Sequence, residues 1–385
     1  MGGRCFFFAG GGTGGHIYPA IAIAERIIKL ERGAKVHFFC STRNIDSQIL
    51  SQTGFEYTSL PVCSFSARPD KLIGFCTSFL ESCRITKRAI SSATGIESKN
   101  AVVVGVGGFV SAPVCFAAHR LKVPIVLLNV DIVPGRANKI IARWADKIFV
   151  QFEDTRQYFA KRGAKVNVVG CPLRIDFDSP EPEKAIEQLG LERQKKTLLI
   201  TGASSGSESI NEAICLLLEK LDGFADDWQI VHLTGRANFE DVRKRYVGVK
   251  ISHKVLDYLD DIPNLLSAAD LVVGRSGGTS VAEYAAANVP SICIPYPYHK
   301  DRHQYLNAGK LVQAGAAVIV DDLPQRKDTA QRLWAELEEL MKNEKKRKKM
   351  AENCKTIANM QAGPKIAEQL FRQGSALPRL MKNLS

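Results

Sequence analysis

The sequence predicts an α/β protein of two similar halves, each with a parallel sheet covered by helices. In both halves, short apolar runs typical of buried strands alternate with segments whose apolar residues repeat at helical spacing. The pattern begins at 5–9, breaks near Gly163 and starts again at 197–201. Loops rich in small residues follow four expected strands, at 10–15, 105–108, 202–206 and 274–278. Strand–helix alternation indicates parallel sheets, and two such halves predict a ligand-binding cleft between domains.

The first expected domain covers residues 1–168. Its strands are expected at 5–9, 36–40, 102–106, 125–128, 148–151 and 166–169, and its helices at 17–30, 45–52 and 112–119. A glycine and a proline at 170–172 and a polar stretch at 176–183 then interrupt the pattern. Such a change in composition favours a domain boundary there.

The second expected domain covers residues 169–363. Its strands are expected at 197–201, 230–233, 271–273 and 291–294, with one amphipathic helix over 210–221. Leucines at helical spacing predict a further helix around 333–341, and the next segment, 342–349, carries six lysines and arginines. We interpret this basic run as a solvated helix face or, alternatively, as a membrane-surface contact.

Composition and charge restrict the class of protein. The 385 residues are 45% hydrophobic and 24% charged, as in ordinary globular proteins, and the formal net charge is +12. A positive surplus favours nucleic acid, an acidic membrane surface or phosphorylated substrates as partners. Because no nucleic-acid recognition motif is present, nucleic acid is disfavoured.

The cysteines and the apolar runs predict a location. The ten cysteines include no Cys-x-x-Cys pair and no zinc-like spacing, so we expect reduced core residues of a cytoplasmic protein. No apolar run reaches the ~18 residues of a membrane span, and the first is too short for a signal peptide. We therefore expect a cytosolic protein, or one peripheral to a membrane.

The first glycine loop and His16 are the main candidates for chemistry. Gly10-x-Gly12-x-x-Gly15 matches the dinucleotide fingerprint, but the next strand ends in Cys-Ser-Thr rather than in an acid for the ribose, which disfavours a nicotinamide cofactor. His16 stands where a Walker loop needs lysine. It is either a hydrogen-bonding residue of the helix start or a general base, since the positive helix end favours the neutral imidazole.

Three further features each allow two interpretations. Ser280 and Glu283 have capping-box spacing, yet a carboxylate just beyond a glycine loop suits the two hydroxyls of a ribose. Arg174 is either a surface residue or a diphosphate ligand. The apolar segment 71–80, flanked by cations, either packs on its own domain or docks on an anionic membrane.

Taken together, five motifs carry a family resemblance. They are GGTGGH at 11–16, GGFVS at 107–111, GCPLR at 170–174, RSGG through the glutamate at 275–283, and DRHQYLNA at 301–308. In this order they resemble the MurG family of peptidoglycan GlcNAc transferases, which belong to glycosyltransferase family 28 and have the GT-B fold. The match spans nearly the whole chain.

The resemblance implies two Rossmann-like domains and an inverting transfer of GlcNAc from UDP-GlcNAc to lipid I, giving lipid II, with no metal or other cofactor. It implies a peripheral protein on the cytoplasmic face of the cell membrane that meets an anionic surface through 72–80. It also implies a C-terminal helix, about 364–380, that packs on the first domain.

The resemblance also assigns residues. On the acceptor side it implies Thr13, Gly14, Gly15 and the loop at 107–108, with His16 as base. The residues implied for the donor are Arg174 and Ser204 for the diphosphate, Leu259 for the uracil, Gly278, Thr279 and Ser280 for the phosphate site, Glu283 for the ribose, and His303 and Gln304 for GlcNAc.

The chain departs from the family pattern at two places. The family usually has His-Glu-Gln-Asn where this chain has Leu-Asn-Val-Asp at 128–131, and Ser-Gln-Gly where it has Ser-Ser-Gly at 204–206. We hypothesise that Asp131 faces the acceptor and orients His16 or shares its role as base. Two alternatives remain open: a related transferase with another lipid acceptor, such as diacylglycerol, and a non-catalytic nucleotide-sugar-binding scaffold protein.

Overall fold

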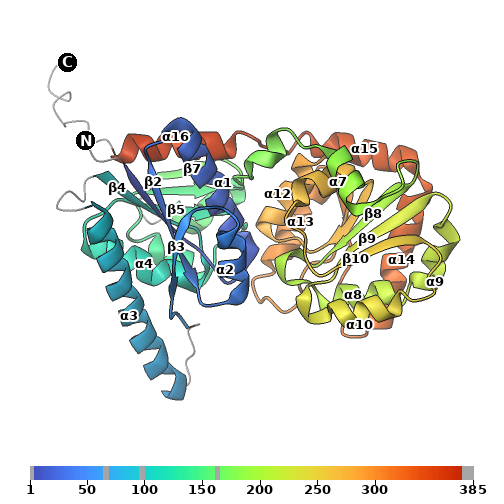
Figure 1. The fold of residues 1–385 in the computed structure, drawn as a ribbon, viewed down its shortest axis with the longest axis horizontal. Coiled ribbons are helices and arrows are strands. Elements are labelled where there is room, and N and C mark those ends of the chain that lie inside the picture. Colours follow the sequence, from blue (N-terminus) through green and yellow to red (C-terminus); the bar gives the residue numbers. More distant parts are fainter. Residues whose placement is uncertain (1–3, 64–68, 95–99, 161–164, 375–385) are drawn as a thin grey trace. The chain divides into compact units, whose positions relative to one another are not determined.

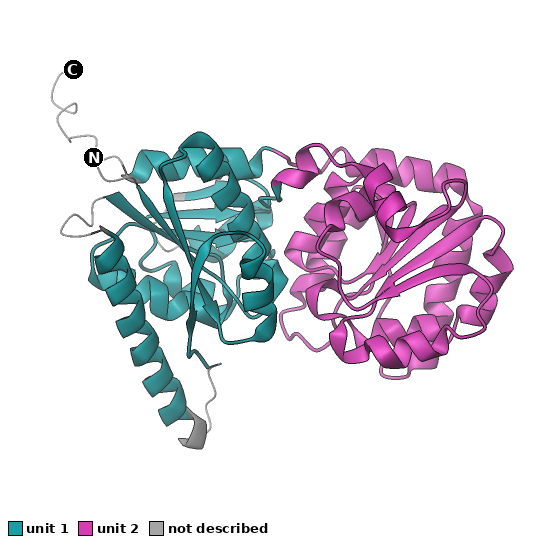
Figure 2. Ribbon diagram, in the orientation of Figure 1, with its two compact units in different colours: residues 1–174, 361–385 teal, residues 175–360 magenta. Residues whose placement is uncertain are grey.

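A computed structural model describes residues 4–63, 69–94, 100–160 and 165–374. The chain forms two compact units (Figure 2): unit 1 comprises residues 1–174 and 361–385, and unit 2 comprises residues 175–360. The predicted boundaries were 168/169 and 363/364, so the division of the structure lies a few residues away from each.

Unit 1 is built on a seven-stranded parallel sheet in the order β3-β2-β1-β4-β5-β6-β7 (Figure 1). Its strands are β1 (Cys5–Ala9), β2 (Lys35–Ser41), β3 (Glu56–Leu60), β4 (Ala101–Gly105), β5 (Ile125–Asn129), β6 (Lys147–Val150) and β7 (Lys165–Val168). Its main helices are α1 (Gly14–Leu30), α2 (Asn44–Ser51), α3 (Pro69–Thr94), α4 (Gly108–Arg120), α5 (Arg136–Ile141), α6 (Arg156–Phe159) and α16 (Ala362–Gly374).

Helices on both faces explain why β1 is apolar at every position. Consecutive phenylalanines point to opposite faces of the sheet, and Phe6, Phe7 and Phe8 are all buried. The Phe8 ring stacks on Phe38 of β2, with centroids 5.2 Å apart, and Phe6 meets Phe371 edge-on at 5.2 Å. The latter contact, together with the packing of α16 on α1, places the C-terminal helix in unit 1.

Unit 2 repeats this strand order with six parallel strands, β10-β9-β8-β11-β12-β13. They are β8 (Lys196–Thr201), β9 (Trp228–Leu233), β10 (Ser252–Leu256), β11 (Leu271–Gly274), β12 (Ser291–Cys293) and β13 (Ala317–Ile319). The helices that cover it include α7 (Pro182–Leu189), α8 (Glu208–Cys215), α9 (Leu218–Leu221), α10 (Phe239–Arg245), α11 (Ile262–Ala268), α12 (Gly278–Ala286), α13 (His303–Gln313), α14 (Arg326–Lys342) and α15 (Glu344–Cys354).

The predicted fold class is confirmed: both sheets are parallel, with helices between their strands. The sequence analysis missed β3, β10 and β13, which all lie at sheet edges. An edge strand is less buried than a central one, so it lacks the continuous apolar run that marks a strand in a parallel sheet. β3, with sequence EYTSL, is largely exposed.

Two predicted helices are wrong in their extent. The single helix expected over 210–221 is interrupted after Cys215, and α9 resumes at Leu218. The basic run 342–349 is likewise divided, because α14 ends at Lys342 and the Asn343 side chain accepts a hydrogen bond from the Lys346 amide (3.0 Å) to start α15.

Most of the basic run 342–349 is engaged within unit 2. Its ion pairs are Lys342–Glu338 (2.7 Å), Lys346–Glu339 (2.8 Å), Lys348–Glu344 (2.7 Å) and Lys349–Glu352 (3.8 Å). Arg347 is buried, with its guanidinium over the Trp228 ring. These contacts favour the interpretation as a solvated helix face over a membrane contact.

All ten cysteines are free thiols, most of them buried, and only Cys63 and Cys76 are exposed. No helix among the described residues combines the length and the hydropathy needed to cross a bilayer.

Candidate functional site

Each sheet has a topological switch point, where chain order reverses between two neighbouring strands. These pairs are β1 and β4 in unit 1, and β8 and β11 in unit 2. Ligands of open parallel sheets bind beyond the carboxyl ends of such strands. The glycine loops predicted from sequence follow these four strands, so each unit has a candidate site of its own.

In unit 1 the His16 ring lies directly against the loop that follows β4. A Cβ atom built on Gly107 would stand 2.7 Å from His16 Cδ2 and 2.9 Å from Nε2, so only glycine fits here. Gly107 also has φ +131°, which favours glycine. The buried Ser111 hydroxyl accepts a hydrogen bond from the Gly107 amide (3.0 Å) and lies 2.6 Å from the Ala9 carbonyl, so it joins this loop to the end of β1.

Thr13 lies next to one of the two imidazole nitrogens of His16. Thr13 is the N-cap residue of α1, and its Oγ1 lies 3.3 Å from His16 Nδ1. When Nδ1 carries the proton and donates to Thr13, the Nε2 atom beside Gly107 is left as an acceptor. The predicted pair Thr13 and His16 is therefore brought together, with Gly14 and Gly15 in the first turn of the same helix.

Asp46, on α2, is a residue of the unit 1 candidate site that the sequence analysis missed. Its carboxylate is fully buried and accepts hydrogen bonds from the Gly12 amide (3.0 and 2.9 Å), the Ser41 amide (2.9 Å) and the Ser41 hydroxyl (2.6 Å). The Gly12 amide, which a phosphate-binding loop would offer to its ligand, thus donates to an internal carboxylate. No sequence signal linked Asp46 to a loop 34 positions away.

A second missed group joins the loop after β5 to α5. The Asn138 side-chain nitrogen donates to Asn129 Oδ1 (2.9 Å), and Asn129 Nδ2 donates to the Asp131 carbonyl oxygen (2.5 Å). Asp131 is the last residue of the segment 128–131 that departs from the family pattern. Its main chain is thereby held just beyond the carboxyl end of β5.

Arg174 belongs to unit 1 in the structure. Its guanidinium carbon lies 4.5 Å from the centroid of the Tyr18 ring, over the same helix that carries His16. The sequence analysis expected this cation to meet the donor diphosphate, and that role stays a prediction.

In unit 2 the loop after β8 is tightly constrained. Ala203 has φ +60° and Gly206 φ +75°, and a Cβ on Gly206 would stand 2.2 Å from the Thr234 carbonyl oxygen. A non-glycine residue in the left-handed region is uncommon and often marks a functional loop. Ser204 lies in the middle of this turn.

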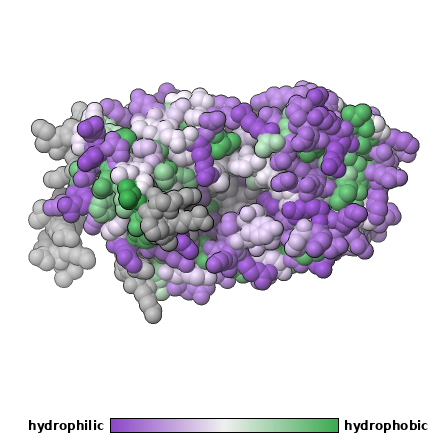
Figure 3. Space-filling view, turned by 90° about the horizontal axis from the view of Figure 1, so that it is seen from below, coloured by the Kyte–Doolittle hydropathy of each residue, from purple (hydrophilic) through white to green (hydrophobic). Residues whose placement is uncertain are grey.

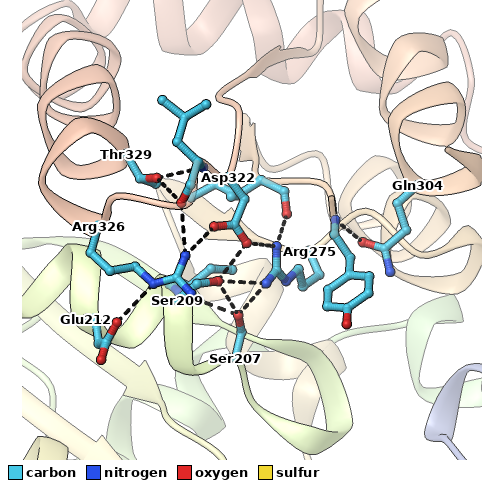
Figure 4. A network of polar contacts seen from close by, with 12 residues as sticks. Ser207, Ser209, Glu212, Arg275, Gln304, Asp322, Arg326 and Thr329 are labelled. Atoms are coloured by element: carbon cyan, nitrogen blue, oxygen red, sulfur yellow. Dashed lines mark hydrogen bonds and ion pairs between the residues drawn. The ribbon is translucent and has the colours of Figure 1, made fainter. Parts of the chain in front are cut away.

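A buried polar network around Arg275 joins the segments that follow β8, β11 and β13 (Figure 4). Arg275 donates to Ser207 Oγ (2.7 Å), Ser209 Oγ (2.8 Å) and the Ile294 carbonyl oxygen (2.9 Å), and it pairs with Asp322 at 2.9 Å. Arg326 extends the network from Asp322 (3.0 Å) to Glu212 (3.0 Å). Burial lowers the pKa of Arg275, and the Asp322 carboxylate opposes that shift.

The loop after β11 is also bound to α13. The buried Ser276 hydroxyl donates to the Gln304 carbonyl oxygen (2.9 Å), and Asn307 Nδ2 donates to the Ser276 carbonyl oxygen (3.1 Å). The Gln304 side chain accepts a hydrogen bond from the Tyr296 amide (2.9 Å). The N-termini of α12 and α13 are therefore fixed beside the same loop.

The capping-box interpretation of Ser280 and Glu283 is wrong. The N-cap of α12 is Gly277, so Ser280 is the third helical residue and Glu283 lies in the second turn. The Glu283 side chain is half-buried, and its neighbour Tyr284 donates to the Arg275 carbonyl oxygen (2.9 Å).

His303 begins α13 inside a group of aromatic rings. Its Nδ1 lies 2.7 Å from Asp301 Oδ1, and its ring stacks on His299 with centroids 4.4 Å apart. Tyr296 packs edge-on against His299 at 4.8 Å. The Asp301 contact directs the other nitrogen of His303, Nε2, away from the carboxylate.

The structure thus gathers the predicted residues at the carboxyl ends of the strands in each sheet. The acceptor candidates His16, Thr13 and Asp131 lie at the carboxyl ends of β1 and β5 in unit 1. In unit 2 the predicted residues lie on the loops or helices that follow its strands: Ser204, Leu259, Gly278, Thr279, Ser280, Glu283, His303 and Gln304. Among the described residues, no group of three or more His, Cys, Asp or Glu side chains is arranged to hold a metal ion.

Comparisons with known proteins match both units. The glycosyltransferase family 28 N-terminal domain matches residues 6–150, and the family 28 C-terminal domain matches residues 197–370. A curated protein of Halothermothrix orenii, named UDP-N-acetylglucosamine–N-acetylmuramyl-(pentapeptide) pyrophosphoryl-undecaprenol N-acetylglucosamine transferase, is 34% identical and covers 91% of this chain and 94% of its own. A protein of Desulfitobacterium hafniense with the same name is 33% identical, over 93% of this chain and 96% of its own.

Solved structures share the fold. MurG of Acinetobacter baumannii superposes with a TM-score of 0.67 at 23% identity, covering 96% of this chain and 99% of its own. A UDP-GlcNAc 2-epimerase from Neisseria meningitidis, solved with UDP-GlcNAc, gives a TM-score of 0.65 at 16% identity, over 96% and 99% of the two chains.

Proposed function

This chain belongs to glycosyltransferase family 28, and on that premise we propose that it transfers GlcNAc from UDP-GlcNAc to the 4-hydroxyl of MurNAc in lipid I, forming lipid II. The observation that carries the proposal is one-third identity, over nine-tenths of the chain, to proteins named for this reaction. The reaction serves peptidoglycan synthesis. The arrangement of His16 supports it, since an imidazole nitrogen beside a glycine loop suits activation of a hydroxyl.

His16 acts as the general base on the acceptor. With Nδ1–H donated to Thr13, Nε2 takes the proton of the 4-hydroxyl as its oxygen attacks C1 of GlcNAc. The C1–oxygen bond to the diphosphate breaks with inversion, and its electron pair leaves with UDP. Asp131 lies just after the carboxyl end of β5 in the same sheet, where it orients the acceptor or shares the proton with His16.

Most of the donor contacts come from unit 2. The N-terminus of α12 offers Gly278, Thr279 and Ser280 to the departing diphosphate, whose charge it stabilises through main-chain amides and the helix dipole. Glu283 accepts hydrogen bonds from the ribose hydroxyls, and Leu259 presents its main chain to uracil. Ser204 and Arg174 contact the diphosphate, and His303 and Gln304 contact the GlcNAc hydroxyls.

The acceptor is lipid-linked, and α3 is the surface that we propose for the membrane. One face of α3 packs on α4, where Phe79 meets Phe116 at 5.9 Å and Cys83 donates to the Pro113 carbonyl oxygen (3.4 Å). Away from these contacts, Leu72, Ile73 and Leu80 are 41%, 73% and 55% exposed, and the exposed cations Arg84, Lys87 and Arg88 lie further along the helix. Apolar residues beside cations suit an anionic bilayer on the cytoplasmic side.

The surface hydropathy is consistent with a local contact of this kind. On the face seen from below, most of the described surface is hydrophilic, and the apolar side chains lie in separate groups (Figure 3). Cosedimentation with vesicles of phosphatidylglycerol tests the proposal. Ile73→Asp should weaken binding severalfold, whereas an equal loss with Val247→Asp, an 83%-exposed position on unit 2, would point to nonspecific adsorption.

The reaction is tested with purified protein, radiolabelled UDP-GlcNAc and lipid I, with diacylglycerol as the competing acceptor and chelator in a parallel sample. Labelled lipid II, unaffected by chelator, is the expected product. Transfer to diacylglycerol alone would indicate the related lipid glycosyltransferase, and donor binding without any transfer would indicate a scaffold protein.

The role of His16 is tested by His16→Ala. This change should lower kcat about 100-fold or more while leaving the affinity for UDP-GlcNAc near that of the wild type. Turnover close to the wild-type value would remove His16 from the chemistry.

A further inference from the structure

We propose that Asp301 is a positioning residue of the donor site, which holds the His303 imidazole in the tautomer whose Nε2 accepts a hydrogen bond from GlcNAc. The inference rests on the proposed function and deepens it, because it names the atom, the direction of the hydrogen bond and the residue that fixes that direction. All the residues concerned lie in unit 2, in the first turn of α13 or in the loop that precedes this helix.

The Asp301 carboxylate contacts His303 twice. Its Oδ1 lies 2.7 Å from the ring Nδ1, and it accepts a hydrogen bond from the His303 amide (3.3 Å). Partial burial raises the pKa of Asp301, but the hydrogen bonds from the ring and the amide of His303 outweigh burial, so this pKa lies below its ordinary value. Because an ionised carboxylate only accepts hydrogen bonds, the proton of the neutral ring must be on Nδ1. Nε2 is then left as an acceptor.

The main chain between these two residues has an uncommon conformation. Arg302 has φ +49°, in the left-handed region that non-glycine residues seldom adopt, and its guanidinium lies over the Tyr305 ring, 4.3 Å from the centroid. Such strain persists where surrounding contacts over-determine the backbone, and it is frequent at ligand sites. The His303 ring also stacks on His299, with centroids 4.4 Å apart. The imidazole is therefore held both at its Nδ1 edge and on one face.

The next residue presents the opposite group. The Gln304 side chain meets the Tyr296 main-chain amide at 2.9 Å (Figure 4), and because that amide only donates, the Gln304 atom must be the oxygen. The Gln304 side-chain nitrogen, which only donates, is thereby turned away from this contact. Consecutive residues of α13 therefore offer one acceptor, His303 Nε2, and one donor, Gln304 Nε2. GlcNAc meets this pair with one hydroxyl donating and another accepting.

The direction at His303 matters because a sugar hydroxyl has a single proton to donate. Without the Asp301 carboxylate, His303 can adopt the other tautomer, in which Nε2 carries the proton and both side chains are donors. The hydroxyl that faces His303 must then direct its own proton elsewhere. Recognition of the sugar should weaken, whereas the contacts to the diphosphate and the uracil should not change.

NMR of protein labelled with ¹⁵N-histidine tests the tautomer without any substrate. At about pH 8, where imidazoles are ordinarily neutral, His303 should carry its proton on Nδ1, and its signals are identified by their absence in His303→Gln. Asp301→Asn should populate the form with the proton on Nε2, although the asparagine oxygen can still accept from the His303 amide. A wild-type His303 that is protonated on Nε2 would overturn the proposal.

Calorimetry of full-length protein with UDP-GlcNAc and with UDP tests the consequence. Asp301→Asn should weaken UDP-GlcNAc binding about 3-fold to 10-fold and change UDP binding less than about twofold, because the lost hydrogen bond is to the sugar. In a His303→Gln background the same change should cost nothing further, since Asp301 acts through His303. Asp328→Asn, at an exposed aspartate in the first turn of α14, is the matched control and should equal the wild type.

Two outcomes of the calorimetry would show that Asp301 only stabilises the start of the helix, and either would overturn the proposal. One is an equal loss for UDP and UDP-GlcNAc in Asp301→Asn, and the other is an undiminished loss in the His303→Gln background. Failure of the wild type to bind UDP-GlcNAc, with His303 protonated on Nδ1, would instead contradict the proposed function.

Discussion

Replacing Asp46 by alanine should destabilise unit 1 and impair the candidate site around His16. The carboxylate is 0% exposed, and two main-chain amides and one hydroxyl depend on it as acceptor. Hydrogen bonds to a charged group contribute about 1.5–3 kcal/mol each, and each buried donor left unpaired costs about 1–3 kcal/mol. Allowing for local relaxation, we expect a loss of about 3–5 kcal/mol in the free energy of unfolding of unit 1.

The three tryptophans allow the units to be followed separately. Trp144 is the tryptophan of unit 1, and Trp228 and Trp334 belong to unit 2. Fluorine NMR of protein labelled with 5-fluorotryptophan gives a signal for each one during urea titration. With a slope of about 2 kcal/mol per molar, the Trp144 midpoint should fall by about 1.5–2.5 M, while the two unit 2 midpoints stay in place.

The same change should reach the chemistry. Gly12 leads directly into Thr13, whose hydroxyl lies 3.3 Å from His16 Nδ1. Under conditions where Asp46→Ala remains folded, kcat should fall about 10-fold, and it should fall less in a His16→Ala background. Glu56→Gln, at an exposed carboxylate of unit 1, is the control. An unchanged Trp144 midpoint would refute the reasoning that the glycine loop depends on this buried anion.

Three further predictions concern unit 2. Glu283→Ala should weaken UDP-GlcNAc binding about 10-fold to 100-fold in calorimetry, since two charge-assisted hydrogen bonds to ribose are lost; affinity at the wild-type level would remove this residue from the donor site. Arg275→Met should lower the free energy of unfolding of unit 2 by about 3–5 kcal/mol, because the buried Asp322 loses one of its two arginine partners and the Ile294 carbonyl oxygen loses its donor; a loss below 1 kcal/mol in urea denaturation would mean that the pair is dispensable. His232 is fully buried between Tyr246 (2.9 Å) and Asn211 (3.1 Å), and burial lowers its pKa from 6.5 to about 3. Since the unfolded chain binds the proton more readily between these values, unit 2 should lose about 2 kcal/mol from pH 7 to pH 5, and His232→Gln should abolish that part of the pH dependence.

The central strands and the glycine loops were predictable from sequence because their signal is local. A strand covered by helices on both faces must be apolar throughout, as in β1 and β4, and a loop that approaches His16 as closely as Gly107 does must be glycine. Edge strands such as β3 and the division between α8 and α9 have no such local signal, so they were missed.

The long-range polar contacts could not be predicted in the same way. Asp46 meets Gly12 across 34 positions, and Arg275 meets Asp322 across nearly 50. An aspartate that serves as a buried acceptor and one that faces water look alike in a sequence. The capping-box spacing of Ser280 and Glu283 shows the converse, since a valid local pattern is overridden when the helix begins at Gly278.

By itself the sequence determined the parallel α/β architecture, the family and the loops that carry chemistry, because each depends on residue types at short spacing. Only the tertiary structure decided how these loops are held, and which atoms meet beside Gly107. Strand order brings the ends of β1, β4 and β5 to one edge, and hydrogen bonds from distant side chains then fix the direction of each donor and acceptor. The direction of a hydrogen bond depends on neighbours that only folding brings together, so it cannot be read from the sequence.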